Sequence, residues 1–502
     1  IAGEVLVIDE NNASFKAEEA HKKANITITG TREKKDGIMK QIIERTLSLA
    51  MSVKNISVSY SSTNGTLLPG YLPQTKILGM TDYRADQEVF GTTSVMRAPT
   101  VPFILGWQDR DFGLWAAENN MITRDSTLNQ PYTMSNSETW NIRASLEPIR
   151  RLRIDLNVNR TYTENISEYY NWTVENPSTG EGYFKVNSQI LTGNFTMTTI
   201  SWGTAFESFG QDGNYQSETF DNFNAYRRTI AERLAQRRPD YDPDAVDENG
   251  YPLGFGQTSQ QVVIPAFLAA YTKQDPNKVS LKTFPSIFKV LPNWRVTYDG
   301  LAKVPQFKDL FRTVNLTHVY RSTYNIGSFA SRLQDLYDPE SGFNYIRDAN
   351  GNFYSQFEIN SISMTEQFSP LIGIDMNWTN SLITKIEFKK SRNLTLSLAN
   401  NQLTETKTDE YIVGTGYRFQ DVEITVGSNK GRKRTFKSDL NIRVDFSLRN
   451  NLTIIRKLEE GVDQPTSGNK IITIKTSADY VLSDRFNLRI FYDHVINRPR
   501  VS

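Results

Sequence analysis

Cysteine is absent from the 502-residue chain, and histidine occurs only three times. Without cysteine the chain has no disulfides, no thiolate metal ligands and no cysteine nucleophile. Three histidines are too few to supply most zinc or iron sites, and they leave little scope for Ser-His catalysis. We therefore expect no cofactor, no metal centre and no enzymatic activity.

A net charge and a long apolar run are missing as well. Lys and Arg number 57 and Asp and Glu number 56, so the formal charge is +1. This balance gives no support to a nucleic-acid partner held by net charge. The most apolar stretches, Val101 to Trp107 and Val262 to Tyr271, contain proline. Both fall well short of the roughly 18 apolar residues of a transmembrane helix, so a helical membrane protein is excluded.

Aromatic residues are abundant by contrast. Phe, Tyr and Trp make up 11% of a sequence whose mean hydropathy is only −0.49. Rings such as Tyr162, Trp172, Trp294 and Tyr298 are expected near the ends of strands. There they suit the aromatic girdles of a membrane β-barrel, and the alternative is packing in the cores of soluble β-domains.

Apolar and polar residues alternate with a period of two in many segments, which is typical of β-strands. Successive side chains of a strand project to opposite faces, so each segment has one apolar face and one polar face. The apolar positions include Leu152, Ile154, Leu156, Leu440, Ile442, Val444 and Phe446. The polar positions include Arg153, Asp155, Asn157, Arg443, Asp445 and Arg489.

Two architectures suit strands of this kind. A soluble sandwich buries the apolar face against a second sheet, whereas a transmembrane barrel turns it toward lipid and the polar face toward a watery lumen. Segment length favours the barrel, since membrane strands need about 9–11 residues and soluble strands average about 5–6. Residues 382–398 and 436–456 are each either one long strand or a hairpin, which the pattern does not distinguish. In the barrel, the apolar set faces lipid and the polar set lines the lumen.

The connections between the patterned segments fall into two classes. Glu147 to Arg150 and Ser483 to Arg485 predict tight turns, whereas large insertions span about 61–138, 203–282 and 330–352. Outer-membrane barrels have short periplasmic turns and long external loops. The connections therefore favour the same architecture as the strand lengths.

The insertions are predicted to be partly helical. Apolar side chains recur every three to four residues in 217–238, and Pro239 ends that pattern. Residues 111–119 predict a second, short helix. Residues 1–35 predict a polar periplasmic or lumenal element, which leaves 36–502 as the barrel portion. The expected fold is all-β, a segment of a very large antiparallel transmembrane β-barrel with long, partly helical extramembrane insertions.

Three local motifs could carry chemistry but have simpler interpretations. The acidic stretch Asp240 to Gly250 could hold Ca²⁺, although it lacks EF-hand spacing and its Asn-Gly pair predicts a turn. The basic segment Gly427 to Arg434 could contact phosphate or lipid head groups, but it is not a P-loop and predicts a solvated turn. His318 lies on the apolar face of a predicted strand and is expected to be an interfacial or packed ring, not a ligand or base.

Three stretches of the chain resemble the translocon of the Bacteroidota type 9 secretion system, the SprA/Sov family. They are residues 64–80 (NGTLLPGYLPQTKILGM), 291–329 (LPNWRVTYDGLAKVPQFKDLFRTVNLTHVYRSTYNIGSF) and 438–460 (SDLNIRVDFSLRNNLTIIRKLEE). The resemblance covers most of the chain from about Thr31 onward. It includes no short catalytic signature, so its specificity comes from the number and order of the stretches.

The resemblance implies a Gram-negative outer-membrane protein that exports folded cargo proteins from periplasm to cell surface, in some members for gliding motility. It also implies contact with outer-membrane lipid, a PorV-like shuttle barrel at a lateral opening, and a plug protein that closes the empty pore. About a dozen patterned segments are too few for the whole barrel of this family. We therefore expect these residues to be its C-terminal portion.

Two other functions remain open at this point. A nutrient-uptake barrel of the TonB-dependent kind would show the same strand pattern. A soluble, secreted, β-rich carbohydrate-binding protein or hydrolase would bury the apolar faces inside a sandwich.

Overall fold

The computed structural model describes residues 5–9, 12–15, 52–73, 103, 105–125, 127–207, 215–331, 343–427, 433–460, 463–483 and 486–500. The chain divides into two compact units, Ile1–Ala50 and Met51–Ser502. In the first unit, strands β1 (Val5–Asp9) and β2 (Asn12–Phe15) form an antiparallel pair. The second unit contains everything described below.

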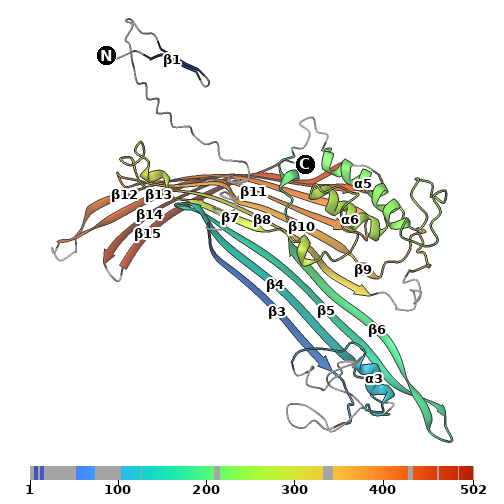
Figure 1. Ribbon diagram of the computed structural model, residues 1–502. Coiled ribbons are helices and arrows are strands. Elements are labelled where there is room, and N and C mark those ends of the chain that lie inside the picture. Colours follow the sequence, from blue (N-terminus) through green and yellow to red (C-terminus); the bar gives the residue numbers. More distant parts are fainter. Residues whose placement is uncertain are drawn as a thin grey trace, which may run out of the picture. The chain divides into compact units, whose positions relative to one another are not determined.

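A 13-stranded antiparallel sheet dominates the second unit (Figure 1). Its main path runs β15-β14-β13-β12-β11-β10-β8-β6-β5-β4-β3, and β7 and β9 pair beside it. The strands are β3 (Val53–Leu67), β4 (Tyr132–Ile149), β5 (Leu152–Asn176), β6 (Glu181–Thr198), β7 (Asn293–Tyr298), β8 (Phe311–Ser331), β9 (Phe357–Ile359), β10 (Ser361–Trp378), β11 (Leu382–Ser397), β12 (Gln402–Gly427), β13 (Lys433–Lys457), β14 (Asp463–Ser483) and β15 (Phe486–Pro499). The prediction of a mainly antiparallel β protein is confirmed. Among the described residues the sheet is open, with β3 and β15 at its edges, and does not close into a barrel.

The long patterned segments are single strands. β13 has 25 residues and pairs with β12 straight through Asn450 and Asn451, where a hairpin was the alternative. β11 likewise continues through Ser391, which pairs with Thr408 of β12. The predicted hairpin between β14 and β15 is confirmed, since the two strands pair antiparallel on either side of it.

One strand position in the sheet is filled by two separate segments. β6 pairs with β5 up to Met197, opposite Arg160, and β7 continues the same line from Asn293, opposite Asn157. Both segments also pair with β8. The chain therefore leaves the sheet in the middle of a strand, forms the insertion 199–292, and returns to the place it left.

The first insertion is shorter than predicted, the second is longer, and the third is shifted. β3 continues to Leu67 and β4 starts at Tyr132, so the first connection is 68–131 and not 61–138. The second insertion is 199–292, and the third connection, between β8 and β9, is 332–356. Ser61 to Gly65 are polar or small and show no alternation, yet their backbones extend the ladder with β4.

Helices occur where the sequence predicts them and at two further places. The two predicted helices are α3 (Phe112–Glu118) and α5 (Glu218–Ala235), and the Ser217 side chain caps α5 by accepting from the Phe220 N–H. The apolar run that contains Pro265 forms α6 (Gln260–Tyr271), which is buried on nearly all sides. A short helix, α4 (Trp202–Ala205), opens the second insertion. No helix in the described part of the chain is long and apolar enough to span a membrane.

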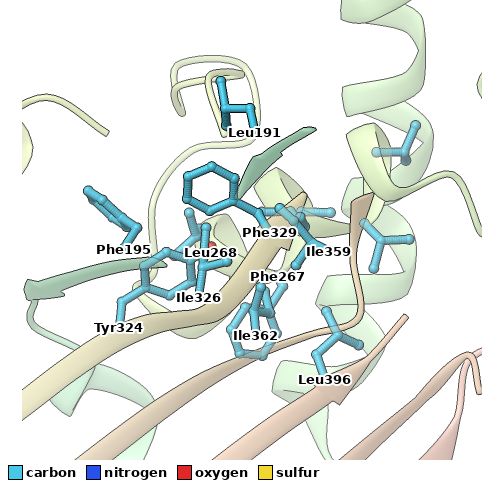
Figure 2. Packing of buried hydrophobic residues seen from close by; sticks show 14 of the residues in the cluster. Leu191, Phe195, Phe267, Leu268, Tyr324, Ile326, Phe329, Ile359, Ile362 and Leu396 are labelled. Carbon is cyan, nitrogen blue, oxygen red and sulfur yellow. The ribbon is translucent and has the colours of Figure 1, made fainter. Parts of the chain in front are cut away.

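The hydrophobic core lies between the insertions and one end of the sheet. Figure 2 shows Phe267 and Leu268 of α6 close to Tyr324, Ile326 and other sheet residues. Phe195 and Tyr324 are fully buried, and their rings meet edge to face at 6.3 Å. Tyr162, expected at a strand end, lies within β5 and packs on this core, so its assignment to an interface girdle is wrong.

Candidate functional site

The two faces of the sheet follow from the pairing registers. Directly paired residues of antiparallel strands project to the same side. Successive pairs lead from Leu156 through Trp294 and Tyr320 to the strands beyond. This register places Leu152, Ile154, Leu156, Leu440, Ile442, Val444 and Phe446 on one face, the apolar face. It places Arg153, Asp155, Asn157, Arg443, Asp445 and Arg489 on the other, the polar face.

At one height the apolar face forms a continuous band, which we call the belt. It crosses the whole sheet from β3 to β15, and none of its side chains is charged. Its residues are Ile56, Val58, Tyr60, Ile142, Ala144, Leu146, Leu152, Ile154, Leu156, Val158, Trp294, Val296, Tyr298, Val314, Leu316, His318, Tyr320, Ile372, Ile374, Met376, Leu382, Thr384, Ile386, Phe388, Tyr411, Val413, Thr415, Tyr417, Leu440, Ile442, Val444, Phe446, Leu448, Ile472, Ile474, Thr476, Ala478, Tyr480, Leu488, Ile490, Tyr492, His494 and Ile496.

Much of the belt is open to its surroundings. Val58, Val413 and Ile490 are 60%, 49% and 63% exposed, although they are apolar. In β13 the belt extends from Leu440 to Leu448, about 26 Å at roughly 3.3 Å per residue. Monomeric soluble proteins rarely expose a contiguous apolar surface of this extent, which needs a partner or an apolar solvent.

The polar face at the same height carries ions and amides. Arg153 pairs with Asp155 at 2.9 Å and Arg443 with Asp445 at 2.7 Å, and Arg489 pairs with Asp479 of the neighbouring strand. The arginines of these pairs are more than half exposed. Such ion pairs stabilise the fold little and are typical of a surface in contact with water.

Beyond the belt, the apolar face carries a row of buried charges, which we call the ionic cluster. Its members are Glu366, Arg392, Glu405, Lys407, Arg456 and Asp463, from five consecutive strands. Arg392 and Glu366 pair at 2.9 Å, and both side chains are 2% exposed. Arg456 is fully buried and pairs with Glu405 at 3.2 Å and with Asp463 at 2.6 Å. The three acids and three bases compensate one another, which buried charges require.

The bases of the ionic cluster also hold the second insertion. Arg392 Nη1 donates to the Thr204 carbonyl at 2.9 Å, and Lys407 Nζ donates to the Glu207 carbonyl at 3.0 Å. Arg456 Nη1 donates to the Tyr215 carbonyl at 2.7 Å. The insertion is therefore tied to the sheet at its first residues through its own backbone.

Hydroxyl and carboxylate groups of the insertion, together with Tyr320 of β8, complete this contact. The Ser201 hydroxyl donates to Glu366 at 2.8 Å, and the Tyr320 hydroxyl donates to the same carboxylate oxygen at 2.8 Å. Burial acts to raise the pKa of Glu207, but hydrogen bonds from Thr219 and the Lys407 charge outweigh it and hold that pKa below its ordinary value. The Glu207 carboxylate is thus charged at neutral pH and complements the cluster.

Sequence reasoning did not find the ionic cluster. A signal existed: Glu405 and Lys407 lie on β12 at the positions that face the apolar side, as does Arg456 on β13. Each breaks the alternation that the neighbouring residues keep. In these strands, a charged residue on the apolar side therefore indicates where another part of the chain packs on that side.

The local motifs have structural roles. Asp247 accepts from the Asn249 and Tyr251 N–H groups in a tight turn, and Asp240 pairs with Arg238 at 2.9 Å. His318 Nδ1 lies 2.6 Å from the Leu371 carbonyl, so this ring is packed as predicted. Within the described ranges no three metal-ligating side chains gather at one point. The basic segment at 427–434 lies mostly outside the described residues.

No protein-family model matches the chain, and a search of curated proteins gives no match.

Proposed function

We propose that this chain forms part of the wall of a protein-conducting channel that exports folded cargo across a bacterial outer membrane. The observation that carries the proposal is the belt, an uncharged and largely exposed band that crosses the sheet from β3 to β15 with members from every strand except β6 and β9. In β13 the belt extends over nine residues, Leu440 to Leu448, and a tilted strand of an outer-membrane barrel needs about 9–11 residues to cross the apolar band.

The polar face supports the same function. In the proposed channel, Arg153, Asp155, Asn157, Arg443, Asp445 and Arg489 would line a water-filled passage. A surface of exposed ion pairs and amides offers no continuous apolar patch on which a folded cargo protein would stick. The wall would therefore guide cargo without catalysis, and no residue is assigned a chemical role.

The remaining features of the proposal come from the resemblance to the type 9 secretion translocon. They are the location in the outer membrane of a Bacteroidota bacterium, the PorV-like shuttle barrel and the plug protein. The open edges at β3 and β15 are compatible with further strands, because unpaired backbone groups in lipid cost several kcal/mol each.

Cysteine labelling of neighbouring residues tests the faces. The chain has no cysteine, so Arg443→Cys and Val444→Cys each carry a single thiol. In outer membranes, we expect a membrane-impermeant maleimide to modify the first and to leave the second unmodified until the protein is denatured. Asp445→Cys and Phe446→Cys repeat the comparison one step along the strand. Equal aqueous reactivity at both positions of each pair would reject the lipid-facing assignment.

A depletion experiment tests the transport. Cells that lose the protein are expected to retain folded cargo in the periplasm while nutrient uptake is unchanged. Loss of uptake with normal secretion would instead indicate a TonB-dependent-type transporter. Recovery of the protein as a detergent-free monomer with affinity for glycans would indicate a soluble carbohydrate-binding protein.

A further inference from the structure

A cleft of about 610 Å³ opens on the polar face of the sheet between β4 and β8. Four arginines line it, Arg143, Arg153, Arg295 and Arg321, with a single acid, Asp155. We call it the arginine cleft. The remaining polar lining includes Asn55, Ser145, Asn157 and Asn293.

The one acid of the cleft is already engaged. Asp155 accepts from Arg153 Nε at 2.9 Å and from the Ser145 hydroxyl. Arg143, Arg295 and Arg321 are exposed, and none of the three is within ion-pair distance of a carboxylate in the described part of the chain. Three positive charges in the cleft are therefore uncompensated.

Three arginines on β12, β13 and β15 of the same face differ from those of the cleft. Arg443 pairs with Asp445, Arg489 with Asp479, and Arg418 with Asp439. Arg418, Arg443 and Arg489 on β12 to β15 are thus each paired with a carboxylate, whereas Arg143, Arg295 and Arg321 of the cleft are not. An uncompensated group of arginines attracts anions, since the guanidinium binds carboxylates in a bidentate manner.

The spacing of the charges selects the kind of anion. Arg143 lies on β4 opposite Asn157 of β5, which in turn pairs with Asn293 of β7, and Arg321 lies on β8 beyond them. Three strand spacings of about 4.8 Å separate the outer arginines by roughly 14 Å. A compact phosphate needs cations that converge on one point. Carboxylates that recur along an extended polypeptide, about 7 Å apart at every second residue, match charges spread in this way.

We propose that the arginine cleft binds carboxylate-rich polypeptide segments, as a transient contact for acidic stretches of the exported cargo. The identification of the ligand as cargo rests on the proposed function. The cleft lies on the face opposite the belt, so the head groups of lipids that contact the belt do not reach it. Exposed charge pairs are weak individually, which suits a surface that must release what it binds.

Peptide binding to the full chain in detergent micelles tests the cleft. The probe is a fluorescent hexaglutamate peptide, and hexalysine is the negative control. We expect hexaglutamate to bind and to dissociate as salt is raised. The triple variant Arg143→Gln/Arg295→Gln/Arg321→Gln is expected to bind about tenfold more weakly or worse, because three charge-assisted contacts are lost.

A matched triple variant removes the same charge elsewhere on the same face. Arg418→Gln/Arg443→Gln/Arg489→Gln takes three arginines that have carboxylate partners, and we expect hexaglutamate affinity to stay within about twofold of wild type. Equal losses in the two variants would mean attraction by net charge alone and would overturn the proposal. Arg143→Lys/Arg295→Lys/Arg321→Lys keeps the charge and is expected to retain most of the affinity, which excludes misfolding as the cause.

Further outcomes test the identity of the ligand and the proposed function independently of each other. If inorganic phosphate at equal ionic strength displaces hexaglutamate from the cleft, the ligand is a compact anion and the polypeptide assignment is wrong. In cells, the first triple variant should slow export of a cargo with an acidic stretch more than the second does, and equal export would remove cargo as the ligand. If labelling rejects the lipid-facing belt while hexaglutamate still binds the cleft, the proposed function fails and the binding site stands.

Discussion

A single side chain of the ionic cluster contributes more to the free energy of unfolding than a side chain of an exposed ion pair does. A buried charge that loses its partner cannot be rehydrated, whereas an exposed charge returns to water. Arg392 is 2% exposed and contacts both Glu366 and the carbonyl of Thr204. Its loss therefore affects the sheet and the insertion together.

Arg392→Met is expected to lower the free energy of unfolding by about 3–5 kcal/mol, because Glu366 is left charged and buried. Arg443→Met makes the same substitution at an exposed arginine, and it should lower the free energy of unfolding by about 1 kcal/mol or less. Chemical unfolding in detergent micelles, followed by circular dichroism, measures both. Adding Glu366→Gln to Arg392→Met should restore part of the loss. Equal effects of the two single variants would contradict the assigned burial.

The pair of Arg238 and Asp240 makes part of the insertion sensitive to acid. Arg238 lies 3.8 Å from the centre of the Phe353 ring and donates two hydrogen bonds to Asp240, which hold the Asp240 pKa below its ordinary value. A lowered pKa in the folded state stabilises the fold above the pKa of the unfolded chain. That stabilisation is lost as the pH falls through the lower, folded value.

Asp240→Asn is therefore expected to lower the melting midpoint of the helical signal at pH 7. The difference from the native chain should shrink as the pH falls below about 3.8, the ordinary pKa of aspartate. Circular dichroism at 222 nm at a series of pH values measures it. Asp242→Asn provides a control on the same loop. A difference between Asp240→Asn and the native chain that is independent of pH would contradict the charge-based account.

At the scale of the element, one strand meets two environments on one face. In β13, Leu440 to Leu448 belong to the belt, whereas Ile454 and Arg456 are fully buried under the second insertion. The register with β12 is regular through this whole length, so no bulge turns the face. The apolar face of β13 therefore changes from exposed belt to buried surface because the second insertion packs on one part of the strand and not on the other.

A lysine substitution in β13 tests whether each face of the strand contacts lipid or water. Val444→Lys is expected to destabilise the protein in lipid vesicles by about 2–4 kcal/mol, the cost of a cation near the middle of the apolar band of a barrel. Ser447→Lys, on the polar face, should be nearly neutral. Urea titration of folding into vesicles gives both values. A neutral Val444→Lys would indicate that the belt meets water.

At the scale of the whole molecule, the second insertion acts as a fixed part of the sheet. Its first residues are held by Arg392, Lys407 and Arg456, and its helices share the hydrophobic core with the strands (Figure 2). A segment that opened during transport would have to break the buried ion pairs of the cluster. If the chain forms the proposed channel wall, we therefore expect the insertion to stay attached while cargo passes.

A disulfide between the insertion and β8 tests this expectation. The Ser201 and Ser322 hydroxyls lie 3.1 Å apart, so the two side chains are direct neighbours across the contact between the insertion and β8. In a chain without other cysteines, Ser201→Cys/Ser322→Cys can form only this intramolecular bond. Oxidation should leave export unchanged. A block of export that a reductant reverses would show that the insertion moves.

Local order was predictable because it is encoded residue by residue. The alternation of Leu152 to Asn157 predicts the two faces of β5, and three-to-four spacing that ends at Pro239 locates α5. The hairpin alternative for β13 could not be excluded, since a three-residue turn keeps the same parity on both sides. The insertion bounds were set too wide at β3 because a polar strand carries no alternation.

The sequence by itself determined which side chains share a face, since the backbone of a strand sends them alternately to its two sides. Only the tertiary structure decided which strands are neighbours, that β6 and β7 share one position, and where the apolar face is covered. The ionic cluster and the arginine cleft depend on that pairing, because their members come from distant segments. Their proximity is fixed by registers between strands, which no local pattern of residues contains.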